Sequence, residues 1–229
     1  MHVYIYMPPL IFSIEGNIGA GKSTFLSALQ DKLGHRKDVC FLQEPIEEWK
    51  LITDENNTNI LERFYKDKTK FSFPFQVMAY ITRLSNLKKA YENPKYNFIF
   101  TDRSLFTDKH VFTQMLYDDG DINEIEYKIY NRWFLEFLEF SNTFQFVYLQ
   151  TSPEKAFERV CKRGRIGESI PIDYLAKCHE YHEKWLLNMK NVLLIDANEE
   201  NTEYTVNAQI LKICNFMSTE RSILCDYSI

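Results

Sequence analysis

Several features that mark particular protein classes are scarce in this chain of 229 residues. Its five cysteines form no C-x-x-C pair, so nothing indicates a zinc site or a thiol redox site, and we expect reduced thiols. No apolar run approaches the roughly 18 residues of a membrane span, and the first residues lack the basic segment of a signal peptide. Basic residues number 27 against 32 acidic ones, so the basic excess typical of proteins that bind polymeric nucleic acid is missing. These absences favour a cytoplasmic protein that acts on small molecules, without nucleic-acid or membrane partners.

Short apolar segments alternate with longer amphipathic ones, a rhythm typical of β-α-β units with a parallel sheet. No linker, repeat or low-complexity tract breaks the series, so we expect one α/β domain over residues 1–229, with a five-stranded parallel sheet flanked by helices. Strands are predicted at residues 10–15, 39–43, 97–101, 144–150 and 192–196. Helices are predicted at residues 22–33, 58–67, 75–92, 105–117, 124–139, 153–162, 174–189 and 204–217, and the tail at 218–229 has no clear period and no assigned role.

A glycine-rich loop follows the first predicted strand and opens the first predicted helix. Its sequence fits the phosphate-binding pattern G-x-x-x-x-G-K-S/T. Glycines let backbone N–H groups close around phosphate oxygens, and the following helix directs the positive end of its dipole at the same anion. Lys22 would bridge the β- and γ-phosphates of a nucleoside triphosphate, and the Ser23 hydroxyl would help to hold Mg²⁺. The predicted ATP-binding loop consists of Gly16, Asn17, Ile18, Gly19, Ala20, Gly21, Lys22, Ser23 and Thr24.

Charged residues follow the second and third predicted strands, where the ends of parallel strands open onto the ligand crevice of an α/β fold. Glu44 can take the proton of an acceptor hydroxyl during phosphoryl transfer. Arg103 can bind an anionic oxygen near the reacting centre, and Asp102 can support Mg²⁺. From position alone, Glu44 could instead be a surface carboxylate that caps the next helix, and Asp102 with Arg103 a structural ion pair.

Arginines gather after the fourth predicted strand. Arg159 and Arg163 share a helix face, and Arg165 follows in a glycine-flanked loop. This segment, about residues 162–171, suits a mobile lid whose charges stabilise the transferred group. A solvated basic face is the alternative interpretation.

Another group of residues has the character of an acceptor pocket. Gln76, Ala79 and Arg83 have the spacing i, i+3 and i+7 and therefore share one helix face. An amide, a small side chain and a guanidinium suit the edge of a planar ring, and glutamine can pair with a base in two places. Aromatic core packing explains the same region equally well. The side chains that could wall such a pocket are Trp49, Tyr65, Phe75 and Phe112.

Together these motifs resemble the deoxynucleoside kinase family that includes deoxycytidine kinase, deoxyguanosine kinase and the insect multisubstrate enzyme. The resemblance runs from about residue 10 to about residue 200 and implies a P-loop kinase fold with a short arginine-rich lid. It rests on EGNIGAGKST at 15–24, EPIEEW at 44–49, NILERFYKD at 59–67, FPFQ at 73–76, DRSLFTD at 102–108, TSPEKAFERVCKRGR at 151–165, IPIDYL at 170–175 and LLIDAN at 193–198.

The resemblance implies roles for residues on the acceptor side. Glu44 would be the general base on the 5′-hydroxyl of a deoxynucleoside, with Arg103 beside it. Tyr65 and Glu168 resemble the pair that holds the 3′-hydroxyl. The other residues matched to the substrate pocket are the base-reading Gln76 and the pocket walls Trp49, Phe75 and Phe112.

On the nucleotide side, Lys22 would act in catalysis with Glu44 and Arg103. The lid shows one departure, because Gly167 stands where the family has the first of two adjacent acids. Asp102 stands where many relatives carry Glu. The residues matched to the lid arginines are Arg159, Arg163 and Arg165, and those matched to the loop that holds the ATP adenine are Asp196, Ala197 and Asn198.

The resemblance extends to a small residue, an arginine and an aspartate that would determine base specificity. Ala79, Arg83 and Asp108 resemble the set found in the deoxycytidine and deoxyguanosine kinases, whereas thymidine-accepting relatives have apolar groups there. An Arg–Asp pair leaves little room for the thymine methyl group and offers donors and an acceptor to amino- and oxo-bearing bases. We therefore expect deoxycytidine and purine deoxynucleosides to be preferred over thymidine.

The sequence thus predicts phosphorylation of a deoxynucleoside by ATP with Mg²⁺. The resemblance implies a homodimer, for which the helices predicted at 75–92 and 124–139 could supply the interface. Two alternatives remain open: a nucleoside monophosphate kinase similar to thymidylate kinase, and a non-catalytic nucleotide-binding module. The first needs basic groups for the acceptor phosphate where this chain has Glu44, Glu47 and Glu48, and the second has no use for Glu44.

Overall fold

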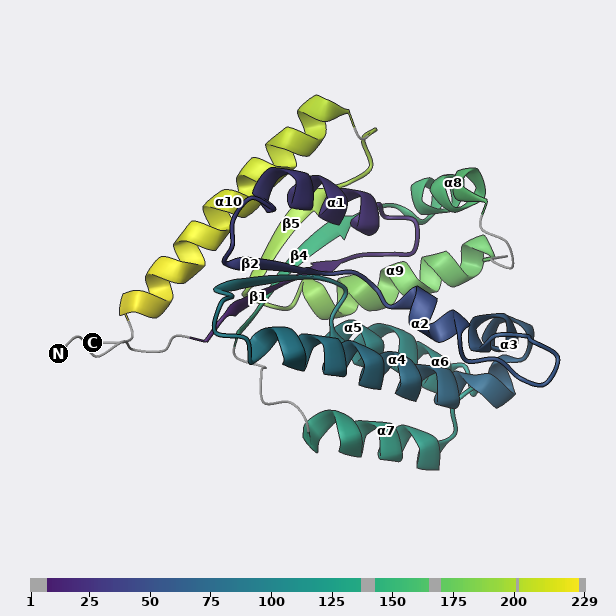
Figure 1. Ribbon diagram of the computed structural model, residues 1–229. Helices are drawn as coiled ribbons and strands as arrows, with labels where there is room; N and C mark the ends of the chain where they lie inside the picture. Colours follow the sequence, from purple (N-terminus) through teal and green to yellow (C-terminus); the bar gives the residue numbers. More distant parts are fainter. Residues whose placement is uncertain (1–7, 137–142, 165–169, 201, 227–229) are drawn as a thin grey trace.

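A five-stranded parallel sheet forms the centre of the fold. The structure is a computed structural model that describes residues 8–136, 143–164, 170–200 and 202–226. The sheet has the order β2-β3-β1-β4-β5, and each pairing is parallel (Figure 1). The predicted α/β fold is confirmed. The strands are β1 (Leu10–Glu15), β2 (Val39–Leu42), β3 (Phe98–Asp102), β4 (Phe144–Gln150) and β5 (Val192–Asp196).

Strand β1 occupies the middle of the sheet because it is suited to burial on both faces. All six of its residues are buried. Ile11 pairs with Ile99 of β3 on one side and with Phe144 of β4 on the other. The chain passes from β3 to β4 across β1, so the strand order reverses there. Ligands of open α/β sheets bind at such a switch point, and the loop that follows β1 lies at it.

Helices cover both faces of the sheet (Figure 1). Helices α1 and α10 pack on one face, where Phe12 and Ile213 belong to the same buried cluster. Helices α4 and α9 cover the opposite face, and α7 lies outside α4. No helix in the described part of the chain is both long enough and apolar enough to cross a membrane. The helical segments are α1 (Lys22–Leu33), α2 (Ile46–Lys50), α3 (Ile60–Lys66), α4 (Lys68–Tyr91), α5 (Leu105–Thr107), the π-helical turn η1 (Asp108–Thr113), α6 (Gln114–Asp118), α7 (Glu124–Glu136), α8 (Pro153–Arg163), α9 (Ile172–Leu186) and α10 (Glu203–Asp226).

Helices α4, α2 and α10 differ clearly from the prediction. Helix α4 begins at Lys68 rather than at residue 75, because Asp67 accepts a hydrogen bond from the backbone N–H of Lys70 (3.2 Å) and Pro74 is accommodated inside the helix. The short helix α2 was not predicted, since five residues are too few to show a period. Helix α10 continues to Asp226, through most of the tail for which the sequence predicted no element.

Candidate active site

The glycine-rich loop between β1 and α1 has a backbone that requires glycine. Gly16, Gly19 and Gly21 have φ values of 142°, 84° and 92°, a region that other residues rarely adopt. A Cβ atom on Gly19 would lie 2.3 Å from the carbonyl oxygen of Ala156 in α8. The loop therefore packs against α8 at a distance that only glycine allows.

Lys22 closes the same loop from inside. Its buried ammonium donates to the carbonyl oxygens of Gly16 (3.0 Å) and Asn17 (2.7 Å). Burial and the nearby Arg103 guanidinium together lower the pKa of Lys22 to about 7, although the carboxylates around it act in the opposite direction. A phosphate anion in the loop would restore the charge of this lysine.

One residue of the loop and one residue beside it are suited to Mg²⁺. The Ser23 hydroxyl donates to Oδ2 of Asp102 (2.7 Å), the last residue of β3. The other carboxylate oxygen, Oδ1, is buried and has no hydrogen-bond partner among the residues that the structure describes. An oxygen pair of this kind suits a small, hard cation. The structure thus places the two predicted metal ligands beside each other.

Glu44 lies between two guanidinium groups. Its Oε1 atom accepts from Arg103 (2.9 Å) and from Arg83 (3.2 Å), and the side chain is only 17% exposed. Burial opposes ionisation of Glu44, yet Arg103, Arg83 and Lys22 outweigh it and lower its pKa to about 2. The carboxylate is therefore ionised at neutral pH and can accept a proton.

Arg83 connects Glu44 with the predicted specificity residues. It donates to Oδ2 of Asp108 (2.9 Å) and, through its NH1 group, to the carbonyl oxygen of Asp102 (2.7 Å). Both Arg83 and Asp108 are buried. Burial raises the pKa of Asp108 above its ordinary value, and the Arg83 guanidinium opposes that increase.

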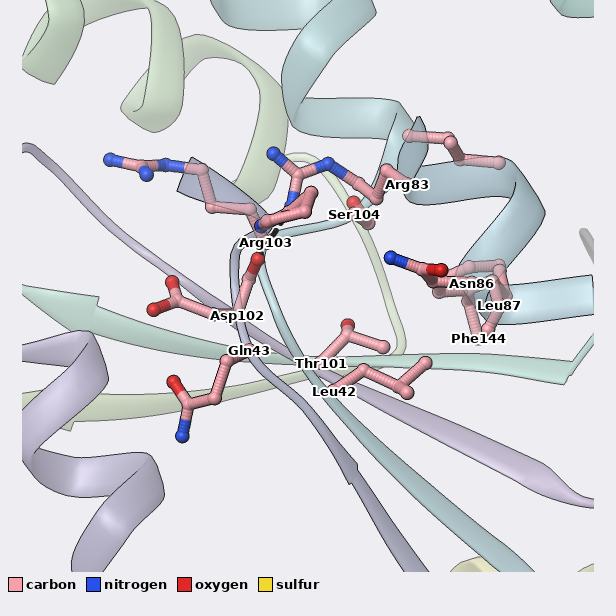
Figure 2. A pocket seen from close by; sticks show the side chains of 12 residues that line it. Leu42, Gln43, Arg83, Asn86, Leu87, Thr101, Asp102, Arg103, Ser104 and Phe144 are labelled. Atoms are coloured by element: carbon pink, nitrogen blue, oxygen red, sulfur yellow. Dashed lines mark hydrogen bonds between the residues drawn. The ribbon is translucent and has the colours of Figure 1, made fainter. Parts of the chain in front are cut away.

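A pocket of about 320 Å³, which includes space open to solvent, adjoins this charge cluster. Figure 2 shows that Arg83 and Asn86 of α4 face the end of β3 across it, with Thr101 on the strand. The Thr101 hydroxyl is buried and has no partner within the described ranges. Of the residues predicted to bind the acceptor, Arg83 and Arg103 line this pocket, whereas the base-reading Gln76 does not.

The residues predicted to read a base gather on the buried side of α4. Gln76 and Ala79 are 3% exposed, and the Gln76 amide makes no hydrogen bond with other described residues. The Phe75 ring stacks on Phe64 at a centroid distance of 4.8 Å and meets Trp49 edge-on at 5.5 Å. A buried amide without a partner is suited to a ligand with matching donors and acceptors.

Phe64, which the sequence did not single out, packs among the predicted pocket walls. It belongs to the same buried cluster as Trp49, Phe75 and Ala79, and it lies directly before Tyr65, with ring centroids 5.2 Å apart. The apolar spacing within α3 was the available signal, although it does not distinguish a pocket wall from core. On the far side, Arg103 lies over the Phe112 ring at 5.2 Å.

The residues predicted to hold the nucleotide base lie beyond α8. Arg159 donates to the carbonyl oxygens of Ala20 (3.4 Å) and Glu199 (2.8 Å), and so links the phosphate loop to the segment after β5. In that segment the Asn198 N–H donates to Asp196 (2.9 Å) and Ala197 is buried. Arg163 ends helix α8 and is exposed. The predicted Arg165 and Glu168 lie outside the described residues.

Comparison with known proteins agrees with this geometry. The family model described as deoxynucleoside kinase matches residues 12–217. The chain is 36% identical to a probable deoxycytidine kinase of fowlpox virus, over 88% of this chain and 77% of the viral one. It is 32% identical to human deoxycytidine kinase over 90% of both chains, and 32% identical to mitochondrial deoxyguanosine kinase of Xenopus laevis over 82% of this chain and 81% of that one. The P-loop sheet and the paired charges at its strand ends therefore belong to a kinase, and the chain is a member of the deoxynucleoside kinase family.

Proposed function

We propose that this enzyme transfers the γ-phosphoryl group of ATP to the 5′-hydroxyl of deoxynucleosides and prefers deoxycytidine and purine deoxynucleosides to thymidine. The observation that carries the proposal is the Glu44 carboxylate, ionised and held 2.9 Å from Arg103 beside the loop that Lys22 closes. A binding module would have no need of an acceptor-facing base at this place.

Glu44 and Arg103 have complementary parts in the proposed reaction. The 5′-oxygen attacks the γ-phosphorus and gives its proton to Glu44, while the bond to the bridging oxygen breaks and ADP leaves. Phosphoryl transfer depends mainly on positioning and charge stabilisation, so a carboxylate with a pKa of about 2 is a sufficient acceptor. Lys22 and Arg103 would stabilise the charge on the phosphate oxygens.

Asp102 and Ser23 would hold Mg²⁺ in the proposed complex. The described residues contain no group of three or more His, Cys, Asp or Glu side chains that could hold a metal. Mg²⁺ typically binds through one or two carboxylates and completes its shell with substrate phosphates and water. The unpartnered Asp102 oxygen fits this mode, and the bound ion would neutralise phosphate charge.

Replacement of Glu44 tests the base. Glu44→Gln keeps the shape of the side chain and removes its charge, so kcat with deoxycytidine is expected to fall by about 10²- to 10⁴-fold, with the KM for ATP little changed. The control is Glu47→Gln, because the Glu47 side chain is 85% exposed and pairs only with Lys50 of α2 among the described residues. Steady-state rates that fall equally in both variants would contradict the role of Glu44.

An acceptor panel tests the reaction itself. Initial rates with ATP and Mg²⁺ are compared for four deoxynucleosides, their ribonucleosides and their 5′-monophosphates. Turnover of the deoxynucleosides is expected. Turnover of the monophosphates alone would identify a monophosphate kinase, and ATP binding without any turnover would identify a binding module.

The Arg83–Asp108 pair is expected to exclude thymidine. Replacing both residues, as Arg83→Met with Asp108→Ala, makes room for the thymine methyl group and removes both buried charges together. The ratio of kcat/KM for thymidine to that for deoxycytidine should rise by at least about 10-fold, which corresponds to roughly 1.4 kcal/mol. An unchanged ratio, measured on protein with an intact thermal transition, would contradict this account of the pocket.

Because the pKa of Lys22 is lowered, we expect the protein to take up a proton when it binds ATP. With a pKa of about 7 in the free protein, Lys22 is mostly neutral at pH 8, and a bound triphosphate restores its charge. ATP binding at pH 8 is therefore expected to take up close to one proton and to weaken as the pH rises from 7 to 9. Titration calorimetry in buffers of different ionisation enthalpy measures the uptake. Lys22→Arg, which stays charged, is the control, and equal uptake in both proteins would contradict the assignment.

We further propose a homodimer formed through α7 with the adjoining α4. Ile125, Ile129 and Trp133 recur at every fourth position of α7 and are 72%, 41% and 50% exposed. The Tyr80 hydroxyl of α4 donates to the Trp133 carbonyl oxygen (3.3 Å), so the two helices are in direct contact. An apolar stripe of this kind is typical of a subunit interface.

The oligomeric state tests this surface. Trp133→Glu places a charge in the stripe and is expected to convert a dimer to a monomer in sedimentation velocity measurements. Leu211→Glu, at an exposed leucine of α10 (62%), should leave the dimer intact. A wild-type protein that is monomeric at micromolar concentration would contradict the proposal.

A further inference from the structure

Glu15 is a fully buried carboxylate to which the proposed reaction gives no role. It is the last residue of β1 and directly precedes the glycine-rich loop. Within the described part of the chain it forms no ion pair; its partners are hydroxyl groups instead. Oε1 accepts from Ser13 (2.6 Å) and from Ser104 (2.6 Å), and Oε2 accepts from Thr107.

Two of these three hydroxyl groups belong to the segment that carries Arg103. Ser104 directly follows Arg103, and its hydroxyl also accepts the backbone N–H of Thr107 (3.3 Å), which begins helix α5. Thr107 bonds to the other oxygen of the same carboxylate. Glu15 therefore fastens the first turn of α5 to the end of β1.

Arg103 needs such support because its backbone is strained. Its φ is +65°, which is unfavourable for a residue with a side chain. A conformation of this kind persists only where the surroundings enforce it. The Arg103 N–H donates to the carbonyl oxygen of Ile14 (3.0 Å), one residue before Glu15. Ile14 thus holds the backbone of Arg103, and Glu15 holds the side chain of the next residue, Ser104.

The position of the Arg103 side chain follows from this backbone. Its guanidinium is almost buried and lies 2.9 Å from Glu44. A relaxed backbone at Arg103 would turn the side chain away from that carboxylate. Ser13 provides an internal control. Its hydroxyl donates to the same carboxylate but, in the described part of the chain, forms no hydrogen bond with residues 103–107.

We propose that Glu15 is a positioning residue: through Ser104 and Thr107 it keeps Arg103 in the left-handed conformation that delivers its guanidinium to Glu44. The proposal rests on the phosphoryl transfer proposed above for its kinetic consequence. Its structural consequence, the conformation of Arg103, is independent of that reaction.

The first experiment compares two hydroxyl deletions at the same carboxylate. Thr107→Val removes a donor from the Arg103 side, and Ser13→Ala removes one from the β1 side. Thr107→Val is expected to lower kcat about 10-fold while the KM for ATP changes less than twofold, and Ser13→Ala to leave kcat within twofold of wild type. Equal effects of the two variants on kcat, or losses that simply follow the loss in thermal stability, would show that Glu15 is only structural.

Substitution of Glu15 itself separates hydrogen bonding from charge. Glu15→Gln can accept from Ser13 and Ser104 and donate to Thr107, so it should keep at least about a fifth of the wild-type kcat, whereas Glu15→Ala should lose about 100-fold. Loss of activity in the glutamine variant as large as in the alanine variant would overturn the positioning role.

If the wild-type protein turns over no deoxynucleoside, the proposed function is contradicted, but the role of Glu15 can still be tested. The test is a crystal structure of the double variant Thr107→Val with Ser104→Ala. In the variant structure Arg103 should leave the left-handed region and separate from Glu44. An Arg103 that keeps its conformation and its contact with Glu44 would overturn the inference, whatever the activity.

Discussion

The site depends on one buried arrangement, a carboxylate shared by two guanidinium groups. Glu44 Oε1 lies 2.9 Å from Arg103 and 3.2 Å from Arg83. An unpaired charge at this depth would cost several kcal/mol, so the segments that carry these groups must meet at the same edge of the sheet. The loop after β2 supplies Glu44, the end of β3 supplies Arg103, and α4 supplies Arg83 from a buried face. These ion pairs therefore require β2 and β3 to end at the same edge of the sheet and α4 to pack beside that edge.

The same charges give two neighbouring groups opposite protonation tendencies. Arg103 contributes to lowering the pKa of Glu44 and also to lowering that of Lys22, because a cation favours a carboxylate and disfavours an ammonium. Without a ligand, the cluster therefore has an ionised Glu44 carboxylate and a Lys22 ammonium close to losing its proton. The phosphates of bound ATP would raise the pKa of Lys22 and so keep this lysine charged. Glu44 would remain a carboxylate.

Features with a local sequence signal could be predicted. The strands, the glycine-rich loop and Glu44 at a strand end follow from apolar runs and from their spacing, and the structure has the sheet where these patterns indicate it. The helix start at Lys68 could not be predicted, because Pro74 is a stronger local signal than the cap at Asp67. The predicted Arg165 and Glu168 lie outside the described residues, so their positions stay predictions.

Contacts between distant residues could not be inferred from the pattern. The Arg83–Glu44 bond joins residues 39 positions apart, and the Thr107–Glu15 bond joins residues 92 apart. Neither spacing corresponds to a helix or strand period. The left-handed backbone of Arg103 is also without a sequence signal, since glycine or asparagine is the usual residue there. Both kinds of feature arise from tertiary structure that overrides local preference.

In the proposed reaction, a change of Arg83 would affect both base recognition and catalysis. Its NH2 group lies 3.2 Å from Glu44 and 3.4 Å from Asp108, so one nitrogen bonds both to the proposed general base and to the proposed specificity residue. Loss of Arg83 alone would leave Asp108 as an unpaired buried charge, and Glu44 would keep only the Arg103 bond. Loss of both Arg83 and Asp108 avoids an unpaired buried carboxylate, because removing both partners of a buried pair costs less than removing one. In either case Glu44 loses its hydrogen bond from Arg83. If the pair sets base preference as proposed, that preference would change most readily by exchange of Arg83 and Asp108 together, with Arg103 left to hold the Glu44 carboxylate.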